Sequence, residues 1–189
     1  MACGTLTKGR GLDCNRISGG IKNIYFALYH QVLSTTVNVD EITDIDMGTS
    51  SLYKYVMPLG VASLTDTITG SRENGTVFYT PTVNIILNRL TKEDQNEIKL
   101  LGQTKVIIFA ELNATLASNG HTVIVCLGRV NGMELNAGTM DSGAAFGDRG
   151  GYTLTFDGLE TEPFIMVKDY TATPFDNADS SNPIPIISA

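Results

Sequence analysis

Apolar and polar residues alternate along residues 77–89, which is the most regular pattern in the chain. The odd positions are mostly apolar, among them Val77, Tyr79 and Val83, whereas the even positions carry mainly hydroxyl and amide side chains. Because the side chains of a strand point alternately to its two faces, this alternation predicts a half-buried β-strand. At about 3.3 Å per residue it would run roughly 43 Å, well beyond the usual length of about five or six residues.

A second strand over residues 62–69 precedes it, and the polar turn Ser71–Gly75 joins the two into a long hairpin. One face of the hairpin would carry hydroxyl and amide side chains and line a channel: Ser63, Thr65, Thr67, Thr69, Thr80, Thr82 and Asn84. The positions expected to serve contacts between subunits lie on the other face and at the tip: Leu64, Ile68, Arg72, Glu73, Asn74, Val77, Tyr79, Val83 and Ile85.

So long a hairpin cannot be covered by a domain of 189 residues, and its edges would expose unpaired backbone N–H and C=O groups. Pairing with the hairpins of identical subunits would remove those edges. The sheet would then close into a barrel between subunits, with the hydroxyl and amide face lining its bore. The alternative is a single large sandwich with one projecting hairpin.

Shorter strand signals occur along the rest of the chain, separated by turns rich in Gly, Ser and Asn. They predict strands over residues 21–29, 105–112, 121–128, 133–139, 152–157 and 164–167. One helix is expected over residues 91–102, because Thr91 can cap its first turn and Gly102 can end it. Its apolar face would hold Ile98, Leu101 and Leu90. The fold class is therefore mainly β, a sandwich or partly open barrel with one short helix and a long hairpin.

Composition divides the chain into three parts. Residues 1–23 are basic and glycine-rich and are expected to form an irregular arm, whereas residues 24–168 form the β domain. Residues 169–189 are rich in Pro, Asn, Asp and Ser, which predicts an extended tail that floats or docks on a neighbour. Within the domain, residues 34–51 are expected to form strand ends and a solvated acidic loop, since they lack the full ligand set of a calcium-binding loop.

The charge and hydrophobic content limit the possible partners. A net charge of −7 argues against wrapping duplex DNA, which would need a basic surface, although DNA could pass such a surface without adhering to it. The first residues are polar and basic, and no apolar run approaches about 18 residues. Neither a signal peptide nor a membrane span is therefore predicted.

Motifs for catalysis, nucleotide binding and zinc proteolysis are absent from the sequence. The chain has three cysteines, an odd number, and reduced thiols are expected. A metal site at Cys3 and Cys14 with His30 or His121 has no supporting ligand spacing. The glycine-rich loop 142–151 could hold an anion through its backbone amides, but a flexible connection is the favoured interpretation. We expect no enzymatic activity, no cofactor and no metal.

Four stretches, in chain order LTKGRGLDCNRISGGIKNIYF, SRENGTVFY, LTKEDQNEIKLL and DSGAAFGDRGGYTLTFDGLE, cover much of residues 5–167. They resemble tail-tube or tail-hub proteins of tailed bacteriophages that infect Bacteroidetes, crAss-like phages among them. The resemblance implies a homo-oligomeric ring of six or twelve copies whose hairpins form an inner barrel. It also implies contacts with other tail and neck proteins, transient passage of viral DNA without specific binding, no membrane contact, and a place in the virion after synthesis in the bacterial cytoplasm.

Other functional classes stay open at this point. A receptor-binding or carbohydrate-binding β-sandwich of the virion, or a head-to-tail adaptor, would also be rich in strands. Carbohydrate sites usually expose aromatic side chains over a flat or grooved face, and this chain has no Trp. A hydrolase with a pair of carboxylates is a third class, because Asp and Glu are plentiful, although no spacing singles out such a pair.

Overall fold

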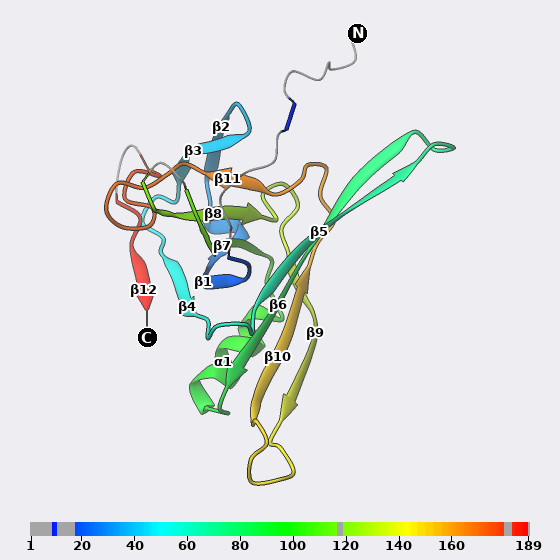
Figure 1. The fold of residues 1–189 in the computed structure, drawn as a ribbon, viewed down its shortest axis with the longest axis vertical. Coiled ribbons are helices and arrows are strands. Elements are labelled where there is room, and N and C mark those ends of the chain that lie inside the picture. Colours follow the sequence, from blue (N-terminus) through cyan, green and yellow to red (C-terminus); the bar gives the residue numbers. More distant parts are fainter. Residues whose placement is uncertain (1–8, 11–17, 117–118, 180–182, 189) are drawn as a thin grey trace.

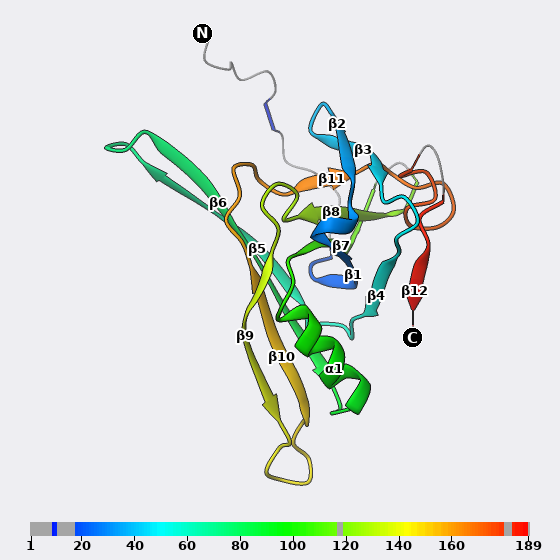
Figure 2. The same ribbon diagram turned by 180° about the vertical axis from the view of Figure 1, so that it is seen from behind.

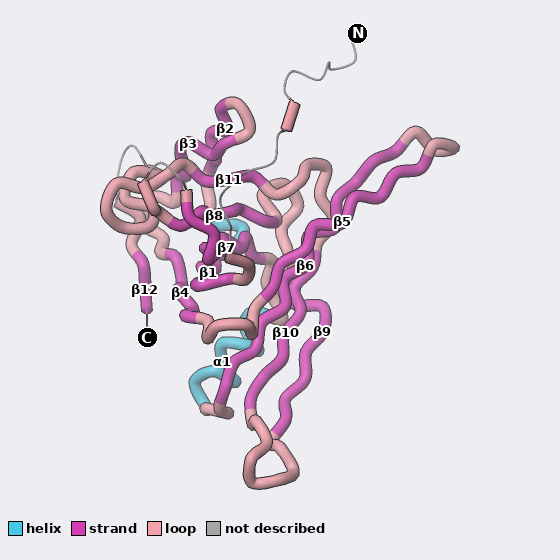
Figure 3. Tube along the Cα trace, viewed as in Figure 1, coloured by secondary structure: helices cyan, strands magenta, loops and turns pink. Residues whose placement is uncertain are grey.

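Two β-sheets and one α-helix make up the computed structural model, which describes residues 9–10, 18–116, 119–179 and 183–188. The larger sheet forms the body of the molecule, and the smaller sheet passes it as a long, twisted strip (Figure 1). Twelve strands lie in the described residues (Figure 3). The predicted mainly β class is therefore confirmed.

The larger sheet has eight strands in the order β12-β4-β1-β7-β8-β11-β3-β2. Neighbouring strands are antiparallel except at two places, β11 beside β3 and β12 beside β4, where they pair in parallel. A 3₁₀ turn, Tyr29–Gln31, follows the first strand. The strands of this sheet are β1 (Ile21–Leu28), β2 (Ser34–Asn38), β3 (Glu41–Asp46), β4 (Leu52–Val56), β7 (Val106–Thr115), β8 (Thr122–Leu127), β11 (Ile165–Val167) and β12 (Ile186–Ser188).

The smaller sheet has four antiparallel strands in the order β5-β6-β10-β9. They are β5 (Ser63–Ser71), β6 (Thr76–Asn88), β10 (Gly151–Asp157) and β9 (Glu134–Asp141). Neither sheet closes on itself into a barrel within the described part of the chain. Among the described residues, no helix has both the length and the apolar character needed to cross a membrane.

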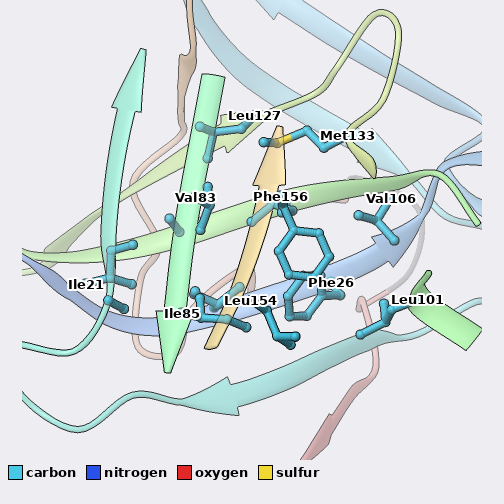
Figure 4. Packing of buried hydrophobic residues seen from close by; sticks show 14 of the residues in the cluster. Ile21, Phe26, Val83, Ile85, Leu101, Val106, Leu127, Met133, Leu154 and Phe156 are labelled. Carbon is cyan, nitrogen blue, oxygen red and sulfur yellow. The ribbon is translucent and has the colours of Figure 1, made fainter. Parts of the chain in front are cut away.

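The main hydrophobic core lies between the two sheets (Figure 4). Val83 and Ile85 of β6 are fully buried there, together with Leu154 and Phe156 of β10 and Phe26 of β1. These β6 residues are odd-numbered, as the alternating pattern requires. The sequence therefore predicted the inward face of β6 correctly.

A second core lies on the other face of the larger sheet, and the C-terminal tail covers it. Phe175 packs edge-to-face on Tyr25 and Phe109, with ring centroids 5.0 and 5.4 Å apart, and Ala178 and Ile184 are buried in the same cluster. A tail that floats or docks on a neighbour was expected, and the described tail residues correct that expectation. Their apolar side chains complete the protein's own fold.

Helix α1 (Lys92–Leu101) begins and ends where the sequence predicts. The Thr91 hydroxyl accepts a hydrogen bond from the Asp94 amide at 3.0 Å, and Gly102 follows the last turn. Ile98 and Leu101 are buried against the main core. Leu90 is a correction, because it precedes the cap and is half exposed instead of facing the core.

Two other segments differ from the sequence analysis. Residues 34–51 contain the hairpin of β2 and β3 in place of a loop, with Val39 and Asp40 both at positive φ in its turn. The basic arm, expected over residues 1–23, lies largely outside the described residues, as do Cys3 and Cys14. Its last three residues begin strand β1, where Ile21 is buried in the core.

Candidate functional site

The outer half of the β5–β6 hairpin projects from the body as a two-stranded ribbon (Figures 1 and 2). β5 pairs with β6 from Ser71 opposite Thr76 to Ser63 opposite Asn84. β10 pairs with β6 only from Thr82 onward. The stretch of β6 before Thr82 therefore has a neighbouring strand on one side only, and the domain covers the base of the hairpin but not its tip.

A short segment, residues 158–164, fastens the hairpin where it leaves the body. Tyr79 and Glu160 exchange two backbone hydrogen bonds of 2.9 and 2.8 Å. The Glu160 carboxylate, itself buried, accepts hydrogen bonds from the amides of Val130 and Asn131 at 3.1 and 2.8 Å. The Phe164 amide donates to Asp66 at 3.0 Å. These bonds fix the direction of the ribbon relative to the larger sheet.

The hydroxyl and amide residues predicted to line a channel do lie on one face of the smaller sheet. Ser63 is opposite Asn84, and the other predicted residues pair as Thr65 with Thr82 and Thr67 with Thr80, while Thr69 lies opposite Phe78. Directly opposed residues of an antiparallel pair share a face. β10 continues this face, since the Thr155 hydroxyl donates to the Asn84 side chain at 2.7 Å.

This face carries carboxylates but no cation, since Asp157 lies opposite Thr82 and Glu134 lies opposite Asp157. None of the four strands contains Lys or Arg. Two apolar residues that the sequence analysis did not assign to the face, Phe78 and Ile86, lie on it because they share the even-numbered register of β6. The alternation of the strand could have predicted both positions, because it places every even-numbered residue of β6 on this face.

The opposite face of the hairpin divides into a buried part and an exposed part. Val83 and Ile85, expected at contacts between subunits, are instead buried in the core of the same chain, because β1 and β7 cover the base of the hairpin. Leu64 packs against that core as well. Further out, Ile68 is 68% exposed and Val77 is 60% exposed. Tyr79 lies between the two regions and is half-buried.

Both outer edges of the smaller sheet lack a neighbouring strand in the described chain. β5 forms one edge and β9 the other, and most residues of both strands are exposed. Folded monomers usually protect such edges with Lys, Pro or a covering segment. Neither strand contains Lys or Pro, and acidic residues occur only at Asp66 in β5 and at the two ends of β9.

The tips of the two hairpins of this sheet lie at opposite ends of the strip (Figures 1 and 2). At the β5–β6 tip, Arg72, Glu73 and Asn74 are exposed, as expected for contact residues, and Gly75 takes a positive φ of 63°. At the β9–β10 tip lies the loop whose backbone amides could have held an anion. Two of these amides, those of Ala144 and Ala145, instead donate hydrogen bonds to the carboxylate of Asp148 in the same loop. These bonds, the one from Ala145 first, hold the pKa of Asp148 below its ordinary value.

Glu111, the most buried carboxylate among the described residues, has no lone pairs left for catalysis. One oxygen accepts hydrogen bonds from Asn23 at 2.6 Å and Tyr25 at 2.9 Å, and the other from Thr122 at 2.7 Å and Lys22 at 3.1 Å. Burial by itself would raise the pKa of Glu111, but these four hydrogen bonds outweigh it and the pKa is lowered. Glu111 is therefore a structural anion that joins β1, β7 and β8.

Other reactive side chains also have structural surroundings. Burial raises the pKa of the Cys126 thiol, which keeps it protonated and unreactive. His121 lies 3.1 Å from an oxygen of Asp169 and stacks on Tyr170, so that it ties the tail to the start of β8. Within the described residues, no group of three or more His, Cys, Asp or Glu side chains could hold a metal ion.

Comparisons with known proteins add no relative, since no family model, curated protein or solved structure matches the chain.

Proposed function

We propose that this chain is a structural subunit of a phage tail, a tube or hub ring that oligomerises through its long hairpins and encloses a channel for DNA. One observation carries the proposal: the smaller sheet ends on both sides in long, exposed strand edges that contain no Lys or Pro. The four stretches that resemble phage tail proteins support the same setting. On this proposal the protein belongs to the virion, contacts other tail or neck proteins, and has no enzymatic activity.

The direction of the strands suits a head-to-tail ring. All neighbours in the order β5-β6-β10-β9 are antiparallel, so β5 and β9 run in opposite directions. If β9 of one subunit lies beside β5 of the next, the alternation continues without interruption. Repetition of this contact by rotation alone gives a closed ring with no free edge.

The stagger of the strands also suits closure. β5 lies opposite Thr76–Asn84 of β6, whereas β10 lies opposite Thr82–Asn88, so β5 and β10 are displaced relative to each other along the sheet. Barrels require such a displacement, because their strands tilt relative to the axis. A flat sheet with level strand ends would favour an open stack of molecules instead.

The face that would line the channel suits passage of DNA. Its Thr, Ser and Asn side chains can hold water, and its four strands contain no cation that could pair with a phosphate group. A binding surface for carbohydrate is less favoured, since the exposed aromatic residues Tyr53, Phe78, Phe146 and Phe164 lie on separate strands and loops.

The test is native mass spectrometry with negative-stain microscopy of the full chain over a range of concentrations. Rings or tubes with a central hole support the proposal and give the copy number. If the protein stays monomeric at every concentration, hydrogen exchange decides between a subunit that awaits a trigger and a solitary sandwich. Fast exchange along residues 66–71 fits an edge strand that lacks its partner subunit, whereas strong protection there contradicts the proposal.

A further inference from the structure

An apolar groove runs between α1 and the exposed edge strand β9. Two adjoining hollows of about 610 and 250 Å³ share Ile98 and Met140 in their walls. Leu154 lines the second hollow, and Gly138 of β9 faces it without a side chain of its own. A Cβ atom at Gly138 would approach Leu154 to 3.0 Å, so glycine keeps this part of the groove open.

Strand β5 carries a side chain that suits the groove. Ile68 lies on the same face of β5 as Leu64, but it extends past the cover of the larger sheet and is 68% exposed. Asp66, two residues away on that face, accepts a hydrogen bond from the Phe164 amide of its own subunit at 3.0 Å, and Lys92 and Lys99 line the groove beside Ile98 and Met140. The apolar side chain of Ile68 would therefore make the main contact of this face.

We infer that Ile68 of one subunit inserts into the α1–β9 groove of the next, where β5 pairs antiparallel with β9 so that Ile68 lies opposite Gly138. This inference rests on the ring assembly proposed above. The hydroxyl face stays continuous between subunits only if even-numbered residues of β5 lie opposite even-numbered residues in this part of β9, because the even positions of both strands lie on the other face. A level pairing of the two edges, like that of β9 with β10, places the middle of β5, at Thr67 and Ile68, opposite the middle of β9, at Gly138 and Thr139.

The register can be tested by a disulfide between subunits. Thr67 and Thr139 would be directly opposed, within reach of a disulfide. The full chain with Cys3→Ser and Cys14→Ser serves as background. On mild oxidation, Thr67→Cys combined with Thr139→Cys should give a ladder of covalent oligomers on a non-reducing gel. Each single variant should run as a monomer on the same gel, because the disulfide needs one cysteine on β5 and one on β9.

The matched control shifts one position by two residues. Thr69→Cys combined with Thr139→Cys places the thiols diagonally, about 7–8 Å apart, and should give little ladder. A control ladder of equal strength would overturn the register. Dimers of Thr67→Cys alone would indicate that β5 pairs with β5, and would overturn the head-to-tail contact.

The groove contact is tested by Ile68→Asp against Leu33→Asp. The two residues are 68% and 66% exposed in the monomer, but Leu33 precedes β2 at the far edge of the larger sheet. Ile68→Asp should raise the concentration at which half the protein is assembled by on the order of tenfold or more, while Leu33→Asp leaves it unchanged.

The two proposals fail in different ways. If rings form but the Thr67–Thr139 pair gives no ladder and Ile68→Asp assembles like wild type, the ring stands and the groove contact is wrong. If neither rings nor a covalent ladder appear at any concentration and residues 66–71 are strongly protected from hydrogen exchange, both proposals are wrong.

Discussion

At the scale of single residues, Glu111 shows how a buried charge holds several strands together. Glu111→Ala would leave the polar groups of Asn23, Tyr25 and Thr122 buried without their acceptor. We expect the free energy of unfolding to fall by about 2–4 kcal/mol, measured by urea denaturation at pH 7. Glu134→Ala is the control, because Glu134 is exposed and pairs only with Lys105, and it should change stability by less than about 0.5 kcal/mol. Equal losses in the two variants would contradict the structural role of Glu111.

The same residue gives the protein a dependence on pH. The pKa of Glu111 is lower in the folded chain than its ordinary value of 4.5, so the unfolded chain binds more protons between those two values. Its contribution is therefore complete above the unfolded pKa and is lost as the pH falls through the folded pKa. Between about pH 5 and pH 3, wild type should lose more stability than Glu111→Gln. If wild type and Glu111→Gln lost the same stability over this pH range, the pH dependence would not come from Glu111.

At the scale of elements, the tail is part of the fold, and two phenylalanines test this. Phe175→Ala removes a ring that is 2% exposed and packs on Tyr25 and Phe109, so it should cost about 3–5 kcal/mol in thermal or urea unfolding. Phe146→Ala alters a fully exposed ring at the β9–β10 tip and should leave stability unchanged. If Phe175→Ala unfolds like wild type, the tail does not belong to the core.

Local patterns accounted for many of the elements. Alternation over residues 77–89 predicted β6 and its apolar face, and the Thr91 cap predicted the start of α1, because each depends on neighbours in sequence. The turn between β2 and β3 was missed because Val39 and Asp40 take positive φ without the glycine that usually marks such a turn. The parallel pairing of β12 with β4 joins segments more than 100 residues apart, which no local pattern reveals.

At the scale of the whole molecule, the division of the hairpin depends on how far the larger sheet extends. The sequence shows that β6 is long and has an apolar and a polar face, but not which half of the strand the larger sheet covers. Val83 and Ile85 were therefore assigned to contacts between subunits, although β1 and β7 bury them. Ile68, on the same face, lies beyond that cover and remains available. The groove at α1 and β9 could not be predicted, because it forms only where the helix packs beside the edge of the sheet.

A charge placed on the hydroxyl face tests whether that face lines the channel. The face should repel or ignore duplex DNA, because its strands contain no cation and the chain has a net charge of −7. Thr67→Lys would place one lysine per subunit on this face, opposite Thr80, and rings of this variant should retain duplex DNA in a strongly salt-dependent manner. Thr36→Lys, on β2 of the larger sheet, adds the same charge outside the proposed bore. Retention is measured by co-sedimentation of assembled rings with linear DNA from about 0.05 to 0.3 M salt. Equal retention by the two variants would place the face outside the channel, whereas retention by Thr67→Lys alone requires the DNA to reach the hydroxyl face.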